Sequence, residues 1–230
     1  MSFAVIEGLD GSGKSTQIKL LREYLVEKAI PYKYLHFPRT DAPVYGDLIA
    51  RFLRGELGNI SDVNPYLIAL IYAGDRNDAR AQILKWLDDG YFVLVDRYVF
   101  SNIAFQCAKL ENQKERDELK EWILHLEYDY HHLPRPDVNL FLDVPFRFTQ
   151  KQLSDKREGE DREYLKGRDD IHEANLDFQK NVREVYLSMK DEKEFSILQC
   201  YNTEEEIYSP VEIFNKIIKI LFHDEVAQAY

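Results

Sequence analysis

The feature that most constrains the fold is a glycine-rich stretch near the start of the chain. It follows a short apolar run, residues 3–6, and precedes a segment in which Ile18, Leu21 and Leu25 share one helical face. Its residues are Gly8, Leu9, Asp10, Gly11, Ser12, Gly13, Lys14, Ser15 and Thr16. Between a strand and a helix, such a loop points backbone N–H groups at one anion, while the lysine reaches outer phosphates and the serine binds Mg²⁺. The stretch therefore predicts a phosphate-binding loop, and an ordinary glycine turn with an exposed lysine is the alternative.

Length and composition bound the remaining possibilities. With 230 residues and 45% hydrophobic content the chain can bury a large core, and the lack of repeats or Pro/Gly/Ser-rich linkers favours one domain over residues 1–230. A net charge of -11 argues against a nucleic-acid polymer as the main partner. No segment resembles a signal peptide or a membrane span, and Cys107 and Cys200 lack metal or redox spacing. We therefore expect a cytoplasmic protein with no membrane partner and with reduced cysteines.

Strand-like and helix-like segments alternate along the chain. Apolar or aromatic runs predict five strands, at residues 3–6, 32–37, 92–95, 138–142 and 195–198. Helical periodicity predicts intervening helices, among them those at 44–54, 65–87, 169–189 and 210–222. This alternation predicts an α/β fold, a five-stranded parallel sheet flanked by helices on both faces.

The second predicted strand delivers a basic residue to the edge of the sheet. Residues 32–37 end at Pro38, which places Arg39 in a loop at the carboxyl edge, where ligands bind in open α/β sheets. Because a guanidinium binds phosphate oxygens in a bidentate manner, Arg39 is a candidate ligand for a second phosphate. The alternative is a loop arginine in solvent.

The helix predicted over residues 65–87 carries both an apolar stripe and a possible base-binding pair. We expect its apolar residues to face the core; they are Leu67, Leu70, Ile71, Leu84 and Leu87. Tyr72 and Arg76 are one turn apart and share a face. They could stack on a flat base and hydrogen-bond its edge, or they could be a packed aromatic ring beside a surface arginine.

The third predicted strand ends in an acid, Asp96, as in the second motif of nucleotide-binding proteins. A carboxylate at this place acts on Mg²⁺ or on its water shell, whereas the alternative is that it caps a helix. Arg97 and Tyr98 follow directly, then Ser101. A helix is expected to continue through Phe105 and Gln106.

A charged stretch, residues 154–168, precedes the helix predicted at 169–189. It carries Lys156, Arg157, Arg162 and Arg168 among acidic residues, and we expect it to have no core face. It could be a solvated loop, but its position is also that of a lid that closes arginines over phosphates. With Arg39 and the region of Arg76 and Arg97, it makes three basic centres outside the glycine-rich loop. A switch GTPase or motor ATPase needs one nucleotide site, so a second anion pocket favours phosphoryl transfer between two small phosphorylated molecules.

The chain resembles the thymidylate kinase family of P-loop nucleoside monophosphate kinases through nearly its full length. Residues 6–16 resemble the phosphate loop of that family, and Phe37-Pro38-Arg39 resembles its phosphate-acceptor motif. Asp96-Arg97-Tyr98 with Ser101 resembles its second signature, and the charged stretch resembles its lid. Since Asp10, Gly11 and Ser12 include no arginine, the chain is similar to the members in which the lid supplies the catalytic arginine.

The resemblance implies a reaction and a set of catalytic residues. The γ-phosphoryl group of ATP would pass to dTMP, giving dTDP and ADP for dTTP biosynthesis, with Mg²⁺ as cofactor. Lys14 would bridge the β- and γ-phosphates, and Ser15 and Asp96 would hold the Mg²⁺ shell. Arg39 and Arg97 would clamp the dTMP phosphate, and Arg157 or Arg162 would act from the lid. The resemblance also implies a homodimer formed through helices.

The resemblance further implies how dTMP is held. Asp10 would contact the sugar 3′-hydroxyl, and Tyr72, where the family commonly has phenylalanine, would stack on thymine. Arg76 would bond a ring carbonyl, Phe105 would crowd a sugar 2′-hydroxyl, and Gln106 would join the base contacts. The full set is Asp10, Phe37, Pro38, Arg39, Tyr72, Arg76, Arg97, Ser101, Phe105 and Gln106.

Two other functions remain open at this point. A kinase of another nucleoside monophosphate or of a deoxynucleoside is the nearer one, although a nucleoside kinase would need a carboxylate base and would gain little from Arg39. A nucleotide-dependent switch or regulatory binding module, with the charged stretch as a partner-binding loop, belongs to a different class. The sequence does not distinguish dTMP from dUMP as the acceptor.

Overall fold

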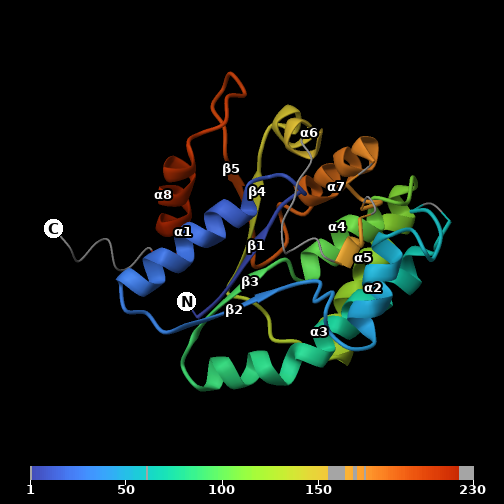
Figure 1. The fold of residues 1–230 in the computed structure, drawn as a ribbon, viewed down its shortest axis with the longest axis horizontal. Coiled ribbons are helices and arrows are strands. Elements are labelled where there is room, and N and C mark those ends of the chain that lie inside the picture. Colours follow the sequence, from blue (N-terminus) through green and yellow to red (C-terminus); the bar gives the residue numbers. More distant parts are fainter. Residues whose placement is uncertain (1, 61, 155–163, 168–169, 174, 223–230) are drawn as a thin grey trace.

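Five strands form one parallel sheet at the centre of the molecule (Figure 1). A computed structural model describes residues 2–60, 62–154, 164–167, 170–173 and 175–222. The strands are β1 (Phe3–Glu7), β2 (Tyr32–His36), β3 (Phe92–Asp96), β4 (Val138–Asp143) and β5 (Phe195–Gln199). Their order across the sheet is β2-β3-β1-β4-β5, and every neighbouring pair is parallel. The predicted fold class is confirmed.

Helices cover both faces of the sheet because alternate residues of each buried strand point to opposite sides. They are α1 (Lys14–Glu27), α2 (Tyr45–Leu53), α3 (Pro65–Asp88), α4 (Val99–Cys107), α5 (Gln113–Leu124), the π-helix η1 (His125–Tyr130), α6 (Phe146–Ser154), α7 (Leu176–Ser188) and α8 (Pro210–Leu221). Ala4 and Ile6 of β1 pack with α1 and α8, whereas Phe3 and Val5 pack in a second cluster with α3, α4, α5 and α7 (Figure 1). Both faces of the sheet are therefore core.

Helix α3 buries only part of the predicted apolar face: Ile71 and Leu87 pack against the core clusters, but three leucines do not. Leu67, Leu70 and Leu84 are 59%, 46% and 36% exposed, so the expectation that these leucines face the core is wrong. Besides Ile68 and Ile83, the fully buried residues of α3 are small or polar: Ala69, Ala73, Gly74, Asp75, Arg76 and Ala79. Small side chains let neighbouring helices approach closely, since a Cβ on Gly74 would lie 2.2 Å from the ring of Tyr45 on α2. The polar residues on that face, Asp75 and Arg76, belong to the candidate active site.

The helix predicted at residues 169–189 begins later, at Leu176. The side chain of Asn175 accepts a hydrogen bond from the backbone N–H of Phe178 and so caps its first turn. Before the cap, the chain docks on α2 instead of forming helix, and the N–H of Ile171 donates to the carbonyl of Leu53. The predicted start of this helix is therefore wrong.

The charged stretch does contribute to the core at its C-terminal end. Leu165 is buried, Tyr164 packs beside α2, and Arg54 of α2 donates from Nη1 to the carbonyl of Tyr164 at 2.6 Å. The expectation that this stretch has no core face is wrong for these two residues. Its residues 155–163 and 168, which include Lys156, Arg157, Arg162 and Arg168, lie outside the described residues.

The cysteines and the helices of the described residues bear on two of the expectations from the sequence. Cys107 and Cys200 are free and buried, as small apolar residues would be. No helix in the described part of the chain combines the length and the apolar character needed to cross a lipid bilayer.

Candidate active site

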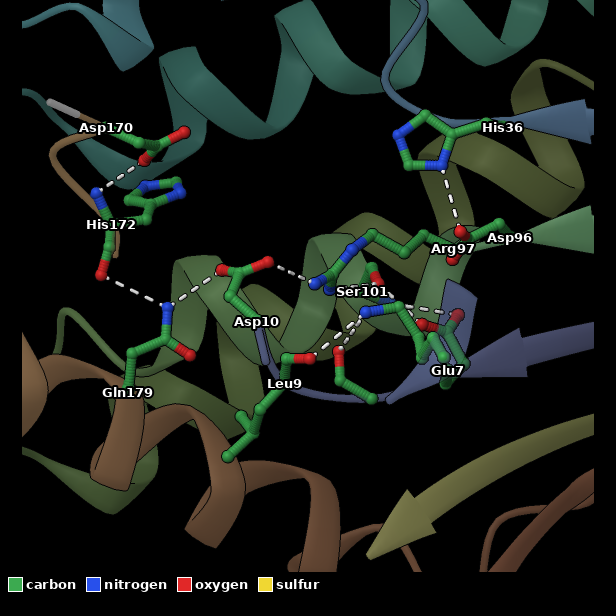
Figure 2. A network of polar contacts seen from close by, with 12 residues as sticks. Glu7, Leu9, Asp10, His36, Asp96, Arg97, Ser101, Asp170, His172 and Gln179 are labelled. Atoms are coloured by element: carbon green, nitrogen blue, oxygen red, sulfur yellow. Dashed lines mark hydrogen bonds and ion pairs between the residues drawn. The ribbon is translucent and has the colours of Figure 1, made fainter. Parts of the chain in front are cut away.

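The glycine-rich loop joins β1 to α1 in the predicted order of strand, loop and helix. Gly13 has a φ of 85°, a left-handed conformation that favours glycine, and α1 begins at the next residue, Lys14. A Cβ on Gly8 would lie 2.6 Å from Ser12 Oγ and 3.2 Å from Lys14 Cγ, so the loop folds tightly over the lysine. Lys14 Nζ donates to the carbonyls of Gly8 at 3.3 Å and Leu9 at 3.1 Å (Figure 2). The ammonium group is thereby held inside the loop.

The pKa of Lys14 is low in the free protein and is expected to rise when an anion binds. Burial and, second to it, the nearby Arg97 lower its pKa to about 8, against the opposing effect of Asp96, Asp10 and Glu7. An anion bound in the loop would stabilise the ammonium form and raise this pKa again. The loop is therefore suited to a phosphate ligand that supplies the missing negative charge.

Arg97 connects the end of β3 to the loop. Its Nη2 donates to Asp10 Oδ1 at 2.6 Å and its Nη1 to Ser101 Oγ at 3.4 Å (Figure 2). Its guanidinium lies 5.0 Å from the centre of the Phe105 ring. Burial opposes ionisation of Asp10, but Arg97 and Lys14 outweigh it and hold the pKa of Asp10 at about 2. Arg97 has a φ of 65°, a backbone strain of the kind found at functional sites. The structure thus brings together four of the predicted site residues.

Glu7, the last residue of β1, accepts hydrogen bonds from the residues that follow Arg97. It is fully buried and accepts hydrogen bonds from the backbone N–H groups of Tyr98 and Ser101, and from the hydroxyls of Ser101 and Tyr186. Burial raises its pKa despite these donors. Glu7 was not predicted, although an acid at the end of a buried strand is the same signal that identified Asp96. Since the Ser101 hydroxyl is held by these groups and by Arg97, a direct contact of Ser101 with dTMP stays a prediction.

Asp96 lies at the end of β3 with one oxygen paired and one free. Oδ2 lies 3.2 Å from His36 Nδ1, while Oδ1 is buried and has no hydrogen-bond partner among the described residues (Figure 2). Burial opposes ionisation, but His36, Lys14 and Arg97 together hold the pKa of Asp96 below its usual range. Tyr98, not Asp96, is the N-cap of α4, which excludes the helix-cap alternative.

Two side-chain oxygens at this edge of the sheet are of the kind that fits a Mg²⁺ ion. The unpaired Asp96 Oδ1 and the exposed hydroxyl of Ser15, in the first turn of α1, are hard oxygen donors of the kind that Mg²⁺ prefers. Within the described ranges, no three His, Cys, Asp or Glu side chains gather as a metal site. A Mg²⁺ ion at a nucleotide site usually takes one or two protein ligands, and water and phosphate oxygens complete its shell.

Arg39 is held against α3 and is not a solvent arginine. Its Nε donates to Asp75 Oδ1 at 2.8 Å, and its Nη2 donates to the Asp75 carbonyl at 2.8 Å and to Asp78 Oδ2 at 2.7 Å. The backbone N–H of Arg39 also donates to Asp75 Oδ2. Nη1 makes no hydrogen bond within the described part of the chain. Before it, Phe37 is buried and a cis peptide bond links Phe37 to Pro38. Asp75, the residue that orients Arg39, was not predicted.

Tyr72 and Arg76 project from α3 next to this region. Arg76 is only 2% exposed and is paired with Glu127 of η1, so the alternative of a surface arginine is wrong. Tyr72 is half-buried at the edge of the cluster formed by α2 and α3. Gln106 Oε1 is buried without a partner among the described residues. The predicted roles of these three residues in binding a base stay predictions.

The segment that follows the charged stretch also reaches the loop. Gln179 of α7 donates from Nε2 to Asp10 Oδ2 at 2.9 Å and to the carbonyl of His172 at 3.1 Å (Figure 2). The His172 ring lies 5.2 Å from the ring of Phe105, and burial lowers its pKa to about 3, so it is neutral. Neither residue was predicted, because Gln179 and Asp10 are 169 positions apart and no local pattern links them.

The carboxyl group of Asp170 has a raised pKa, which makes the stability of the protein depend on pH. It accepts hydrogen bonds from Tyr164 Oη and the His172 N–H, both at 2.8 Å, and burial, aided by Asp10, raises its pKa to about 7 from an ordinary value of 3.8. The folded chain therefore binds more protons than the unfolded chain between about pH 4 and pH 7, and its free energy of unfolding falls as pH rises through this window.

We expect Asp170→Asn to remove this loss, because an amide keeps an acceptor oxygen without the buried charge. The variant should be more stable than the wild type by about 2 kcal/mol at pH 8 and by less than half of that at pH 5. Urea denaturation at the two pH values measures this difference. Asp88→Asn, at an exposed position on α3, is the control that should show no such pH dependence. Equal stability of wild type and D170N at both pH values would contradict the expectation.

Known proteins with similar sequences and structures agree on one family. The thymidylate kinase family model matches residues 6–211. A probable thymidylate kinase from Pyrobaculum aerophilum is 30% identical, covering 95% of this chain and 99% of that relative, and one from Staphylothermus marinus is 34% identical, covering 91% and 92%. The solved structure of thymidylate kinase from Candida albicans aligns with a TM-score of 0.68 at 25% identity, covering 94% of this chain and 89% of that one. The chain belongs to the thymidylate kinase family, the enzymes of ATP-dependent phosphorylation of dTMP to dTDP.

Proposed function

We propose that the site divides into an ATP side and a dTMP side that meet at the Asp10–Arg97 pair. The observation that carries this division is the placement of three cationic side chains, Lys14, Arg97 and Arg39, on three different strand-to-helix connections of one sheet edge. A single nucleotide needs only the first of these connections. Phosphoryl transfer brings the γ-phosphate of the donor in line with the phosphate of the acceptor. Cations on all three connections can hold both phosphate groups in place during this approach.

On the ATP side, residues 8–16 surround the phosphates, and Lys14 bridges the β- and γ-phosphates. Its position inside the loop and its lowered pKa support this role, since a phosphate restores the charge that burial disfavours. Ser15 and Asp96 hold Mg²⁺, which neutralises phosphate charge when it is bound. The unpaired oxygen of Asp96 supports that assignment.

On the dTMP side, Arg39 and Arg97 bind the acceptor phosphate. The second pKa of a phosphate monoester is about 6, so its attacking oxygen is already ionised at neutral pH and no strong general base is required. Phe37 and Pro38 place Arg39, and Ser101 acts on Arg97 through its hydrogen bond. Asp10 meets the sugar 3′-hydroxyl, Phe105 excludes a 2′-hydroxyl, and Tyr72, Arg76 and Gln106 form the base site.

The lid supplies charge that the phosphate-binding loop lacks. No arginine occurs at positions 10–12, whereas Arg157 and Arg162 follow in the charged stretch. We assign the transition-state role to these lid arginines, with Arg157 as the first choice. The anchoring of Tyr164 on α2 supports a lid whose C-terminal end is fixed to the body of the enzyme.

The enzyme acts as a cytoplasmic homodimer in this proposal. Support comes from the exposed leucines of α3, Leu67, Leu70 and Leu84, because a second copy packed on this helix would cover them. Sedimentation equilibrium measures the mass in solution, and a monomer at micromolar concentration would contradict the proposal.

A coupled ADP-release assay with a panel of acceptors tests the function itself. We expect strong turnover with dTMP and little with dCMP, dGMP, AMP or thymidine, and the dUMP arm measures a selectivity that the sequence leaves open. Strong turnover with thymidine would assign the chain to the nucleoside kinases. Absence of turnover with every monophosphate would instead favour a nucleotide-dependent switch.

Arg39→Ala separates the two sides of the site. We expect the KM for dTMP to rise by about tenfold or more while the KM for ATP changes less than twofold, because Arg39 belongs to a different connection from the phosphate-binding loop. Asp78→Asn, which removes one exposed partner of Arg39, is the control with a smaller effect. Equal loss of affinity for ATP and dTMP would remove Arg39 from the acceptor side.

Arg157→Ala tests the lid. We expect kcat to fall by about 10³-fold or more with little change in the dissociation constant of either nucleotide, because an arginine finger acts on transition-state charge. Arg162→Ala, measured in parallel, compares the second lid arginine. Single-turnover rates that stay unchanged in R157A and fall in R162A would transfer the role to Arg162, and unchanged rates in both would exclude a lid finger.

A further inference from the structure

Arg97, the arginine directly after β3, has a backbone conformation that a residue with a long side chain does not favour. Its φ of 65° lies in the left-handed region, and such a conformation persists only where the surrounding structure holds it. The guanidinium of the same residue binds Asp10. Whatever holds the backbone of Arg97 therefore also directs its side chain.

Two consecutive residues of β1 fix the peptide groups on either side of Arg97. The N–H of Arg97 donates to the carbonyl of Ile6 at 3.0 Å. The N–H of Tyr98 donates to Oε1 of the Glu7 side chain, also at 3.0 Å. Because φ and ψ of Arg97 are the two rotations between these peptide groups, the two hydrogen bonds together determine its conformation. Only the second of them depends on a side chain.

Glu7 also caps helix α4, which begins two residues after Arg97. The N-cap residue, Tyr98, makes no capping hydrogen bond with its own side chain. In a capping box, the N-cap side chain accepts from the N–H of the third helical residue, and the side chain of that residue accepts from the N–H of the N-cap. Here Glu7 Oε1 accepts both bonds, from the N–H of Tyr98 and from the N–H of Ser101 at 3.3 Å. One oxygen from β1 thus replaces both halves of a capping box.

This cap from another element leaves Tyr98 free to fill the core. Tyr98 is fully buried, and its ring centre lies 5.5 Å from that of Phe3 and 6.0 Å from that of Phe37. A serine or aspartate at this position could cap α4 by itself but would leave that volume empty. The start of α4 is therefore fixed relative to β1, the strand that leads into the phosphate-binding loop at Gly8.

The second oxygen of Glu7 binds two hydroxyl groups. Oε2 accepts from Ser101 Oγ (Figure 2) and from Tyr186 Oη of α7, the latter at 2.9 Å. A hydroxyl can accept as well as donate, so neither of them requires a charge on Glu7. Glu7 also has a smaller effect on the pKa of Arg97 than Asp10 has, and burial raises the pKa of Glu7 itself. The contribution of Glu7 is thus the placement of its acceptor oxygen more than its charge.

We propose that Glu7 is a positioning residue for phosphoryl transfer, because its Oε1 holds the backbone turn that directs Arg97 toward the acceptor phosphate. This inference rests on the proposed function, in which Arg97 binds that phosphate. It adds that the residue before Gly8 fixes the acceptor-binding turn, so one end of β1 places both the loop around ATP and the arginine that faces dTMP. Glu7 is fully buried and contacts neither nucleotide.

Glu7→Gln and Glu7→Met test the role of the acceptor oxygen with side chains of nearly the same length. The amide keeps an oxygen for the two N–H groups and turns its NH₂ toward the two hydroxyls, whereas the thioether offers no comparable acceptor. We expect E7Q to keep kcat and the KM for dTMP within about threefold of wild type. E7M should raise the KM for dTMP and lower kcat by about tenfold or more each, while the KM for ATP changes less than threefold. Tyr186→Phe, which removes one donor to Oε2 and leaves Oε1 in place, is the matched control and should behave like E7Q.

The KM for dTMP separates loss of orientation from loss of folded enzyme. Partial unfolding lowers the apparent kcat but leaves both KM values as they are. If E7M does not fold, Glu7→Asp gives the same comparison, because it draws the carboxylate back by one methylene group from the two N–H groups, and the KM for dTMP should rise likewise. A tenfold loss in E7Q, or an unchanged KM for dTMP in folded E7M or E7D, would overturn the inference and leave Glu7 with a structural role. The wild-type rate with dTMP tests the proposed function separately.

Discussion

The contact on which the rest of the site depends is the ion pair between Asp10 and Arg97. It joins the phosphate-binding loop after β1 to the turn after β3, and Gln179 of α7 binds the second oxygen of the same carboxylate. Without Asp10, the cations Arg97 and Lys14 would lie buried near each other and would repel. Asp10 neutralises part of this positive charge, so the side chains are held in place before any phosphate enters the site. The positive charge that remains still attracts a phosphate.

Helix α3 positions two arginines through consecutive residues, Asp75 and Arg76. Asp75 orients Arg39, and Arg76 is oriented by Glu127, so the two arginines to which we assign the acceptor phosphate and the base are both positioned through one helix. A helix that carries these polar groups inward cannot also bury a full stripe of leucines. This explains why Leu67, Leu70 and Leu84 are exposed, and why apolar periodicity, which assumes an apolar core face, assigned them wrongly.

What could be predicted from the sequence was encoded locally. Backbone geometry dictates the spacing of neighbouring residues in the loop of residues 8–16 and at the two strand ends, at Asp96 and before Arg39. These parts of the fold are confirmed. Glu127 and Gln179 carry no such signal. Their partners lie on other elements, and a lone acid or amide in a helix is ordinarily a surface residue. Only the packing of α7 and η1 against α4 and the loop reveals them.

Helix α2 extends this organisation toward the lid. At its N-terminal end, a Cβ on Gly46 would lie 2.3 Å from the carbonyl oxygen of Arg39, so the helix rests directly on the acceptor loop. At its C-terminal end, Arg54 binds the carbonyl of Tyr164, and Leu53 accepts a hydrogen bond from Ile171. A single short helix thus contacts the loop that holds Arg39 and the chain that follows the lid. Because packed interiors are nearly incompressible, a shift of one of these segments must be accommodated at the other. The loop that carries Arg39 and the segment that carries Tyr164 therefore share one mechanical support, although 125 residues separate Arg39 from Tyr164 in the sequence.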